Sequence, residues 1–332
     1  MPNSTKPSQT PVNRRFSVAP MMDWTDRYCR YFHRLLSRNT LLYTEMVTTG
    51  ALIYGDVERH LQYHGIEHPI ALQLGGSDPK ELAQSVTIAN TYQYDEINLN
   101  CGCPSDRVQS GKFGAVLMKD PKLVAQCFES MQAVTETPVT IKHRIGVDDQ
   151  DGYQPLCDFV GTVANAGCKT FIVHARKAWL QGLSPKQNRE VPPLEYEHVF
   201  QLKRDFPELE IIINGGISTL EQTQELLVSV DGVMMGREAY QNPYILAEVD
   251  QKIYHDKQPI PSRVQVLEKF SKIIDKELSK GIKLSHMTRH ILGLYQGVPG
   301  ARKFRRYISE NAHRRDAGID VLYQALNSMA TS

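Results

Sequence analysis

Eight short apolar segments rich in β-branched residues recur between residues 16 and 238, with stretches of helical character between them. The segments span residues 16–20, 41–46, 69–75, 96–102, 138–144, 170–176, 210–216 and 232–238. Near-continuous apolar runs such as Ile211-Ile212-Ile213 are typical of parallel strands that are buried on both faces. Eight strand and helix units in about 225 residues is the number and size expected of a (β/α)8 TIM barrel.

Helix start signals separate these segments. Asp78-Pro79 and Asp120-Pro121 each place a capping acid before a proline at the first helical position, and Ser218 with Glu221 forms a cap-plus-glutamate pattern. A doubly wound open sheet would also alternate strands and helices. The number of units, and the absence of Gly-x-Gly-x-x-Gly after the first strand, favour the barrel.

The strand pattern ends after Tyr244, and the rest of the chain is predicted to be helical. From Pro261 onward Leu267, Phe270, Ile274 and Leu278 follow helical spacing, and further helices are expected from Ser285, Gly300 and Asp316. We therefore expect a disordered polar leader at 1–14, a barrel domain at 15–250 and an all-α domain at 251–332.

Composition indicates an ordinary soluble globular protein. The 332 residues are 41% apolar and 23% charged, and no segment is apolar enough to be a signal peptide or a membrane span. Six scattered cysteines are typical of reduced thiols in a cytosolic protein. The expectation is a cytoplasmic monomer with no obligate protein partner and no metal site.

The charge is divided unevenly along the chain. The net charge is only +1, but residues 276–332 carry ten Lys or Arg against four Asp or Glu, a balance of 10 − 4 = +6. The rest of the chain then carries (38 − 10) − (37 − 4) = −5. A polyanionic partner and a merely solvated basic face both account for such a tail.

Almost every predicted strand ends in hydrogen-bonding chemistry. In a parallel barrel these ends share one face, where such folds keep their active sites. The rim residues are Met21, Met22, Asp23, Glu45, Gln73, Asn98, Asn100, Cys103, Lys142, Arg144, His174, Arg176, Asn214, Gly215, Gly216, Gly236 and Arg237. A single polar residue at one strand end is usually structural, but their recurrence around the rim favours a functional site.

Two glycine-bearing turns on adjacent strands indicate a phosphate site. Asn214-Gly215-Gly216 and Gly236-Arg237 supply bare backbone N–H groups and a guanidinium where these barrels commonly hold a phosphate. Lys142 and His174 are suited to the polar edge of a flavin, so the corner suits flavin mononucleotide (FMN). Residues 110–113 do not form a Walker loop, because the upstream glycine and the following hydroxyl are missing.

Two thiols follow the fourth predicted strand, where Asn98 and Asn100 are expected to point toward the rim. Cys101 and Cys103 lack the further ligands of a zinc site, and their close spacing disfavours a disulfide. Cys101 is expected to pack in the core. Cys103, which lies past the strand end, is the better candidate for a thiol that acts as a general acid.

These motifs together resemble one known family, the flavin-dependent tRNA-dihydrouridine synthases. The resemblance covers roughly residues 15–320 and is nearest to the branch that modifies D-loop uridines at positions 20 and 20a. It is carried by Ala19-Pro20-Met21, Asn98-Leu99-Asn100-Cys101-Gly102-Cys103-Pro104, Lys142-His143-Arg144, His174-Ala175-Arg176, Asn214-Gly215-Gly216 and Gly236-Arg237.

The resemblance implies that NADPH reduces FMN, which then gives hydride to C6 of a tRNA uridine while Cys103 protonates C5. It implies that Asn100 contacts the target nucleotide and that Lys186, Arg189, Arg302 and Arg305 orient the tRNA. The FMN-binding residues that it implies are Pro20, Met21, Met22, Gln73, Lys142, His174, Asn214, Gly215, Gly216, Gly236 and Arg237.

Two other functions stay open from the sequence. A flavin barrel acting on a free small pyrimidine or enone would share the phosphate corner and the cysteine but would leave the basic tail unexplained. An RNA-binding protein on an inactive barrel would not need the complete set of rim residues. Arg302, Arg305 and Arg306 share one face of a predicted helix, which favours a nucleic-acid substrate.

Overall fold

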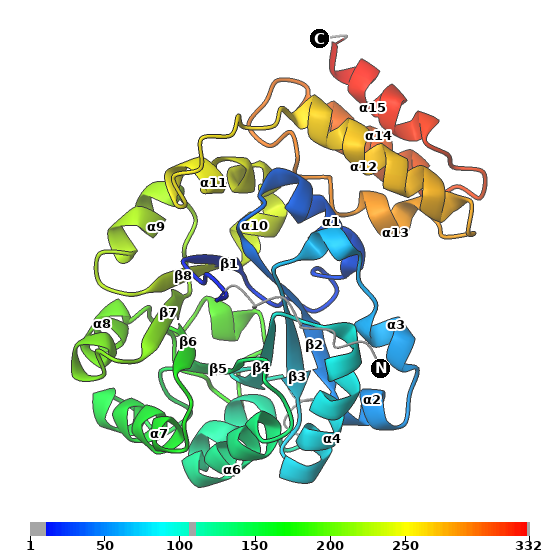
Figure 1. The fold of residues 1–332 in the computed structure, drawn as a ribbon. Helices are drawn as coiled ribbons and strands as arrows, with labels where there is room; N and C mark the ends of the chain where they lie inside the picture. The colour runs from blue at the N-terminus through cyan, green and yellow to red at the C-terminus, as the bar shows by residue number, and fades with distance from the viewer. Residues whose placement is uncertain (1–10, 106–110, 331–332) are drawn as a thin grey trace.

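The computed structural model, which describes residues 11–105 and 111–330, contains a closed barrel of eight parallel strands in chain order (Figure 1). The last strand pairs with the first and closes the sheet. The strands are β1 (Phe16–Val18), β2 (Leu41–Thr48), β3 (Ile70–Gly75), β4 (Glu96–Cys101), β5 (Val139–Arg144), β6 (Thr170–His174), β7 (Glu210–Asn214) and β8 (Gly232–Met235). The predicted barrel and all eight predicted strands are confirmed.

Apolar residues on both faces of the strands account for this barrel. In β7, Ile212 belongs to a small cluster inside the barrel, whereas Ile211 and Ile213 belong to the large core between the strands and the outer helices. The interior cluster consists of Ala19, Leu41, Tyr43, Ala71, Ile172, Ile212 and Met234. Continuous apolar runs are needed because every barrel strand is covered on both sides.

The outer helices begin where the capping signals lie. Asp78 and Asp120 cap α4 and α6, each with proline at the start of the helix. The N-cap of α9 is Thr219 rather than the expected Ser218, because the Thr219 hydroxyl accepts a hydrogen bond from the backbone N–H of Gln222. The α-helices described between β1 and β8 are α1 (Arg27–Leu36), α2 (Thr49–Ile53), α3 (Val57–Leu61), α4 (Pro79–Ala89), α6 (Pro121–Gln132), α7 (Tyr153–Asn165), α8 (Tyr196–Asp205) and α9 (Leu220–Leu226).

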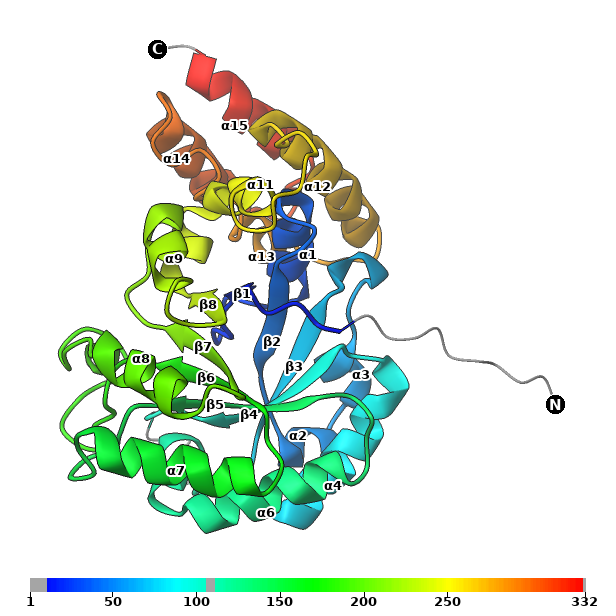
Figure 2. The ribbon, with the colours of Figure 1, turned by 60° about the vertical axis from the view of Figure 1, so that its left-hand side comes forward.

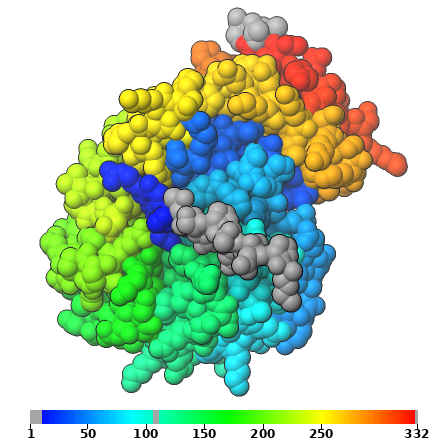
Figure 3. Space-filling model, viewed as in Figure 1, coloured from blue at the N-terminus to red at the C-terminus, as the bar shows by residue number. Residues whose placement is uncertain are grey.

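The chain after β8 is helical, and its last helices form a lobe beside the barrel (Figures 2 and 3). Its elements are α10 (Arg237–Gln241), α11 (Val249–Lys252), α12 (Arg263–Leu278), α13 (Leu284–Thr288), α14 (Ala301–Asn311) and α15 (Asp320–Ala330). The final helix begins at Asp320, four residues later than expected. The predicted division at residue 250 falls inside α11 and stays a prediction. None of the helices in the described ranges combines the length and apolarity needed to cross a lipid bilayer.

The N-terminal end of the barrel is closed by a buried arginine. Arg14 donates to Glu96 at the start of β4 over 2.5 Å and to Glu210 at the start of β7 over 2.9 Å. Arg14 was expected to belong to the disordered polar leader, and this was wrong. It is buried, and its charge is paired with two carboxylates that the fold brings together from distant segments. Residues 1–10 of that leader lie outside the described residues.

The helical lobe is joined to the barrel through α1. Asp26 is the N-cap of α1 and accepts hydrogen bonds from the N–H groups of Tyr28 and Cys29. It also forms an ion pair of 2.6 Å with Arg289, which follows α13. His290 Nε2 lies 3.0 Å from the same carboxyl group. Burial opposes ionisation of Asp26, but hydrogen bonds from His290, Cys29 and Arg289 outweigh it and lower its pKa to about 2.

We expect Asp26→Asn to weaken the folded state in a pH-dependent way. A carboxyl whose pKa is lowered on folding stabilises the native state above its unfolded pKa of about 3.9, and this stabilisation is lost as pH falls toward the folded value. Urea unfolding should give a difference of about 2 kcal/mol between wild type and variant near pH 7, shrinking between pH 4 and pH 2. An unchanged difference at pH 3 would contradict the assignment, and Asp275→Asn on the exposed face of α12 is the control.

Candidate active site at the carboxyl ends of the strands

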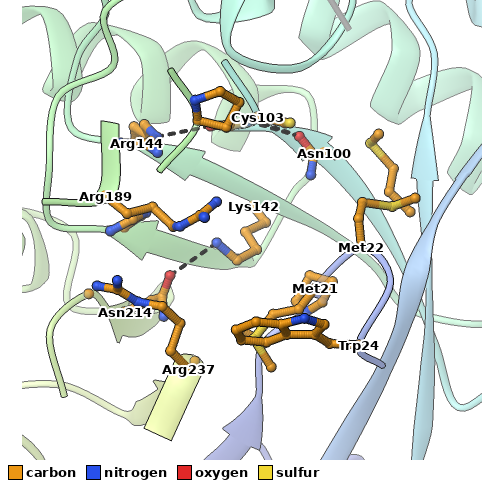
Figure 4. Close-up of a pocket in the computed structure, with 18 of the residues that line it drawn as sticks. Met21, Met22, Trp24, Asn100, Cys103, Lys142, Arg144, Arg189, Asn214 and Arg237 are labelled. Atoms are coloured by element: carbon orange, nitrogen blue, oxygen red, sulfur yellow. Dashed lines mark hydrogen bonds between the residues drawn. The ribbon is translucent and has the colours of Figure 1, made fainter. Parts of the chain in front are cut away.

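A cavity of about 660 Å³ opens at the carboxyl ends of the strands (Figure 4). It brings together most of the residues that the sequence singled out, although they lie up to 217 residues apart. The predicted residues that line it are Pro20, Met21, Met22, Gln73, Asn100, Cys103, Lys142, Arg144, His174, Arg189, Asn214, Gly215, Gly216, Gly236 and Arg237. Asp23, Glu45 and Arg176 were expected at the rim but do not line the cavity.

Lys142 projects from β5 into the middle of this cavity. Figure 4 shows it between Arg189 and Arg237 on one side and Met21 and Trp24 on the other. Its Nζ donates to Oδ1 of Asn214 over 3.1 Å. Burial, with a smaller contribution from the charge of Arg144, lowers the pKa of Lys142 to about 7. No carboxylate among the described residues pairs with the Lys142 ammonium. An anion bound in the cavity would therefore stabilise its charge.

His174, at the end of β6, has no side-chain hydrogen bond among the described residues. Burial lowers its pKa well below the usual value, and the nearby charges of Arg144 and Lys142 lower it further. The imidazole is therefore neutral near pH 7, with one nitrogen able to donate and the other able to accept. Such a ring suits the polar edge of a heterocyclic ligand.

Three glycines line the cavity near His174, for two different reasons. Gly215 and Gly216 have φ of +120° and +70°, and a Cβ on Gly215 would meet the His174 ring at 2.7 Å. A Cβ on Gly236 would meet no protein atom within 4 Å. Gly236 thus borders open space, into which a ligand group could come close to the backbone.

Asn100 holds the turn that carries Cys103. Its Oδ1 accepts from the N–H groups of Gly102 and Cys103 over 3.1 and 3.0 Å, and Arg144 Nε donates to the carbonyl of Gly102 over 2.9 Å. Cys103 is partly exposed to the cavity, and its Sγ lies 3.5 Å from the Ser105 hydroxyl. Two side chains therefore fix the backbone next to the candidate thiol.

Two of the predictions for β4 have different outcomes. Cys101 is fully buried and burial raises its pKa well above the usual value, which confirms that it packs in the core. Asn98 was expected to point toward the rim, and this was wrong. It is fully buried inside the barrel, below the cavity, and bonds to Gln73 and Thr140. Side chains two residues apart on a strand share a face but reach different depths of a barrel.

The basic residues predicted for tRNA fall into two places. Arg189 lines the cavity, as does Arg237, which was predicted to bind the cofactor and forms an ion pair of 2.6 Å with Glu190, whereas Lys186 is exposed outside the lining. Arg302 and Arg305 lie on α14 in the helical lobe, around a separate hollow formed by segment 296–305. The structure therefore does not place all the predicted tRNA residues in one cavity.

Several lining residues were missed by the sequence analysis. Trp24 stacks on Tyr240 with ring centroids 4.4 Å apart, and Met46 and Gln241 complete the apolar and polar sides of the cavity. Trp24 stands three residues after Met21 in the same loop, so its position after the first strand was an available signal. Met46 and Gln241 carry no such local signal.

These observations define the class of protein. A closed (β/α)8 barrel with a glycine-lined basic corner, a central lysine and a thiol in one cavity has the architecture of the barrel enzymes, whose active sites lie at the carboxyl ends of the strands. The described residues contain no group of three or more His, Cys, Asp or Glu side chains positioned to hold a metal ion.

Comparison with known proteins narrows this class to a family. Residues 17–330 match the model of the protein family described as "Dihydrouridine synthase (Dus)". The chain is 60% identical to a tRNA-dihydrouridine(20/20a) synthase of Vibrio cholerae over 313 residues, which cover 94% of this chain and 95% of that protein. It is 60% identical to the Escherichia coli K12 protein of the same name, over 98% and 95% of the two chains, and 58% identical to that of Yersinia pestis, over 99% and 95%. The chain belongs to the dihydrouridine synthase family.

Proposed function

We propose that this protein is a tRNA-dihydrouridine synthase, which reduces D-loop uridines at positions 20 and 20a with FMN as bound cofactor and NADPH as reductant. One observation carries the proposal: a single cavity joins the glycine-lined basic corner, Lys142 and the thiol of Cys103. The relatives with nearly full-length identity carry the name tRNA-dihydrouridine(20/20a) synthase.

The residues around the cavity fit FMN. Gly236 leaves backbone next to open space where a phosphate would lie, and Gly215, Gly216 and Arg237 line the same corner. Lys142 has donors left after its bond to Asn214, and His174 has both ring nitrogens available. These two side chains would meet the polar edge of the isoalloxazine ring, while Pro20, Met21 and Met22 would cover its apolar part and Gln73 would donate to a ring carbonyl.

When bound and reduced by NADPH, FMN supplies the hydride that C6 of the uridine receives. Cys103 then donates its thiol proton to C5, so that the C5=C6 double bond becomes a single bond and the resulting thiolate is reprotonated from solvent. Asn100 holds the Cys103 turn and lines the same cavity, so it would contact the base that Cys103 protonates. Because the target base must leave its stack to enter the cavity, the enzyme has to bind RNA well beyond that nucleotide.

The decisive assay incubates the FMN-loaded protein and NADPH with tRNA that lacks dihydrouridine, and in parallel with free uridine and free dihydroorotate. We expect dihydrouridine to form in the tRNA at positions 20 and 20a, as detected by mass spectrometry of nuclease fragments. Turnover of a free pyrimidine without turnover of tRNA would overturn the proposal in favour of a small-molecule oxidoreductase.

We expect Cys103→Ala to slow uridine reduction by about two to four orders of magnitude, the usual effect of losing a general acid. FMN binding and NADPH oxidation by oxygen should stay near wild-type values, because neither needs the proton donor. Single-turnover mixing of reduced enzyme with tRNA measures the rate. Cys157→Ala removes a partly exposed thiol on α7 and is the matched control. Full activity in the Cys103 variant would assign the proton donor elsewhere.

We expect FMN affinity to fall as pH rises from 7 to 9. Burial holds the pKa of Lys142 near 7 in the free protein, so above that pH binding must also protonate the amine, at a cost of up to about tenfold per pH unit. The FMN phosphate is already a dianion in this range. Fluorescence titration should give a flat profile for Lys142→Met, and Lys80→Met on the exposed side of α4 should behave as wild type. A flat wild-type profile would contradict this role for Lys142.

We expect the double change of Arg302 and Arg305 to Ala to weaken tRNA binding and to flatten its salt dependence, by about one unit of log–log slope or less for each lost phosphate contact. FMN binding should not change, because both residues lie outside the cavity. Filter binding at several salt concentrations measures the slope. Arg204→Ala on α8 removes an exposed arginine from the barrel as a control. An unchanged slope would place the tRNA contacts on another surface.

A further inference from the structure

Part of the barrel interior is a cluster of polar side chains. At the floor of the cavity and beneath it, β3, β4 and β5 contribute Gln73, Glu96, Asn98, Asn100 and Thr140, all of them at most 8% exposed. Strands β6 to β8 contribute Ile172, Ile212 and Met234 to the apolar cluster inside the barrel, together with the buried polar side chains of Thr170 and Asn214. Buried polar side chains cost free energy unless they are hydrogen-bonded, so the polar cluster on β3 to β5 needs an explanation.

These polar side chains form a continuous chain of hydrogen bonds that begins at Glu96. A carboxylate can only accept, so the Thr140 hydroxyl donates to Glu96 Oε1 over 2.7 Å. The hydroxyl then has only lone pairs left and accepts from Asn98 Nδ2 over 2.8 Å. Asn98 therefore turns its carbonyl upward, and Oδ1 accepts from Gln73 Nε2 over 2.8 Å. The chemistry of the carboxylate sets the direction of each bond above it.

The chain continues to the thiol turn in the same direction. Gln73 Oε1 accepts from Asn100 Nδ2 over 2.9 Å, and Asn100 Oδ1 accepts from the N–H groups of Gly102 and Cys103. Backbone N–H groups can only donate, so the upper end imposes the same direction as Glu96 does at the lower end. Every amide in the chain thus has one orientation that satisfies both of its neighbours.

The lower end is held firmly in place. Glu96 also accepts from Arg14 Nε over 2.5 Å and from the Tyr43 hydroxyl over 2.5 Å, and it is fully buried at the N-terminal end of β4. Neither Asn98 nor Thr140 lines the cavity. A fixed charge on one end face of the barrel is therefore connected to the Cys103 turn at the other end face through residues that touch no ligand.

We propose that Thr140 and Asn98 are positioning residues, which transmit the acceptor character of Glu96 to Gln73 and Asn100 and so hold the Cys103 turn. The consequence for recognition is that Gln73 and Asn100 have their carbonyl oxygens engaged and offer N–H donors to the cavity. They would select ligand carbonyl groups rather than ligand N–H groups. The part of this inference that concerns uridine reduction rests on the proposed function, whereas the positioning of Cys103 does not.

Loss of the Thr140 hydroxyl would remove the acceptor that fixes the orientation of the Asn98 amide at the lower end of the chain of hydrogen bonds. Asn98 would then face a methyl group in either amide orientation, and only the N–H groups of Gly102 and Cys103 would still favour the native direction. A reversed Asn100 would place its NH2 group against those N–H groups and release the turn. The substitution removes one of the hydrogen bonds that oppose this reversal, which corresponds to about three- to tenfold in the equilibrium between the two arrangements.

The test compares Thr140→Val, Thr140→Ser and the matched control Thr170→Val. Thr170 is also buried, lies on the next strand and donates to Glu210, the other carboxylate that binds Arg14, over 2.9 Å. The control loses the same kind of bond in the same layer of the barrel but leaves the amide chain intact. The readouts are the melting temperature, the rate of Cys103 alkylation by iodoacetamide resolved by peptide mass spectrometry, and kcat and KM for tRNA.

For Thr140→Val we expect Cys103 alkylation, which needs the released turn, to rise by about three- to tenfold, and kcat to fall, with KM for tRNA within about twofold. Thr140→Ser should restore both values, and Thr170→Val should stay at wild-type rates while melting at a temperature similar to that of Thr140→Val. Cys157, the other partly exposed thiol, provides an internal reference for alkylation.

Equal changes in the Thr140→Val and Thr170→Val proteins would overturn the proposal, because they would show only loss of core stability. Wild-type alkylation in Thr140→Val would overturn it as well. The alkylation rate needs neither tRNA nor FMN. A wild-type protein that fails to reduce tRNA would therefore refute the proposed function while the positioning of Cys103 is still tested.

Discussion

The pairing of β8 with β1 is the interaction on which the rest of the structure depends. It joins Phe16, Ser17 and Val18 to residues 233–235 in parallel register and converts eight consecutive strands into a ring. Closure makes the carboxyl ends of all strands converge, so Met21, Lys142 and Arg237 share a cavity although long stretches of chain separate them. The same closure creates an interior that must be filled, and this protein fills part of it with hydrogen-bonded polar side chains.

That cavity contains positive charge that the protein neutralises only in part: Glu190 pairs with Arg237, whereas Lys142 and Arg144 have no carboxylate partner among the described residues. Lys142 lies among Arg144, Arg189 and His174, and burial with mutual repulsion lowers the pKa values of all four. Arg144 donates to the carbonyls of Gly102, Lys177 and Asn188 rather than to a carboxylate. A ligand with a phosphate and an electron-rich ring edge would supply the missing negative charge. The site therefore gains stability when such a ligand binds.

The sequence predicted the barrel and most of the rim because both follow from local patterns. Continuous apolar runs marked the strands, and the polar residues directly after them marked the face where the site lies. Depth inside the barrel has no such pattern, so Asn98 was placed at the rim together with Asn100. Arg14 resembled its polar neighbours, and only the fold brings Glu96 and Glu210 to it. Met46 was missed because an apolar residue at a strand end looks the same whether it fills a core or lines a cavity, whereas the place of Trp24 after the first strand was a signal that could have been used.

A structure of the protein crystallised with FMN would test most directly that one cavity serves both cofactor and thiol. The account predicts the phosphate at Gly215, Gly216, Gly236 and Arg237, and the polar ring edge within hydrogen-bond distance of Lys142 and His174. It also predicts that Cys103 faces the ring across a space wide enough for one base. A flavin bound outside this cavity, or one whose ring fills the space in front of Cys103, would contradict it.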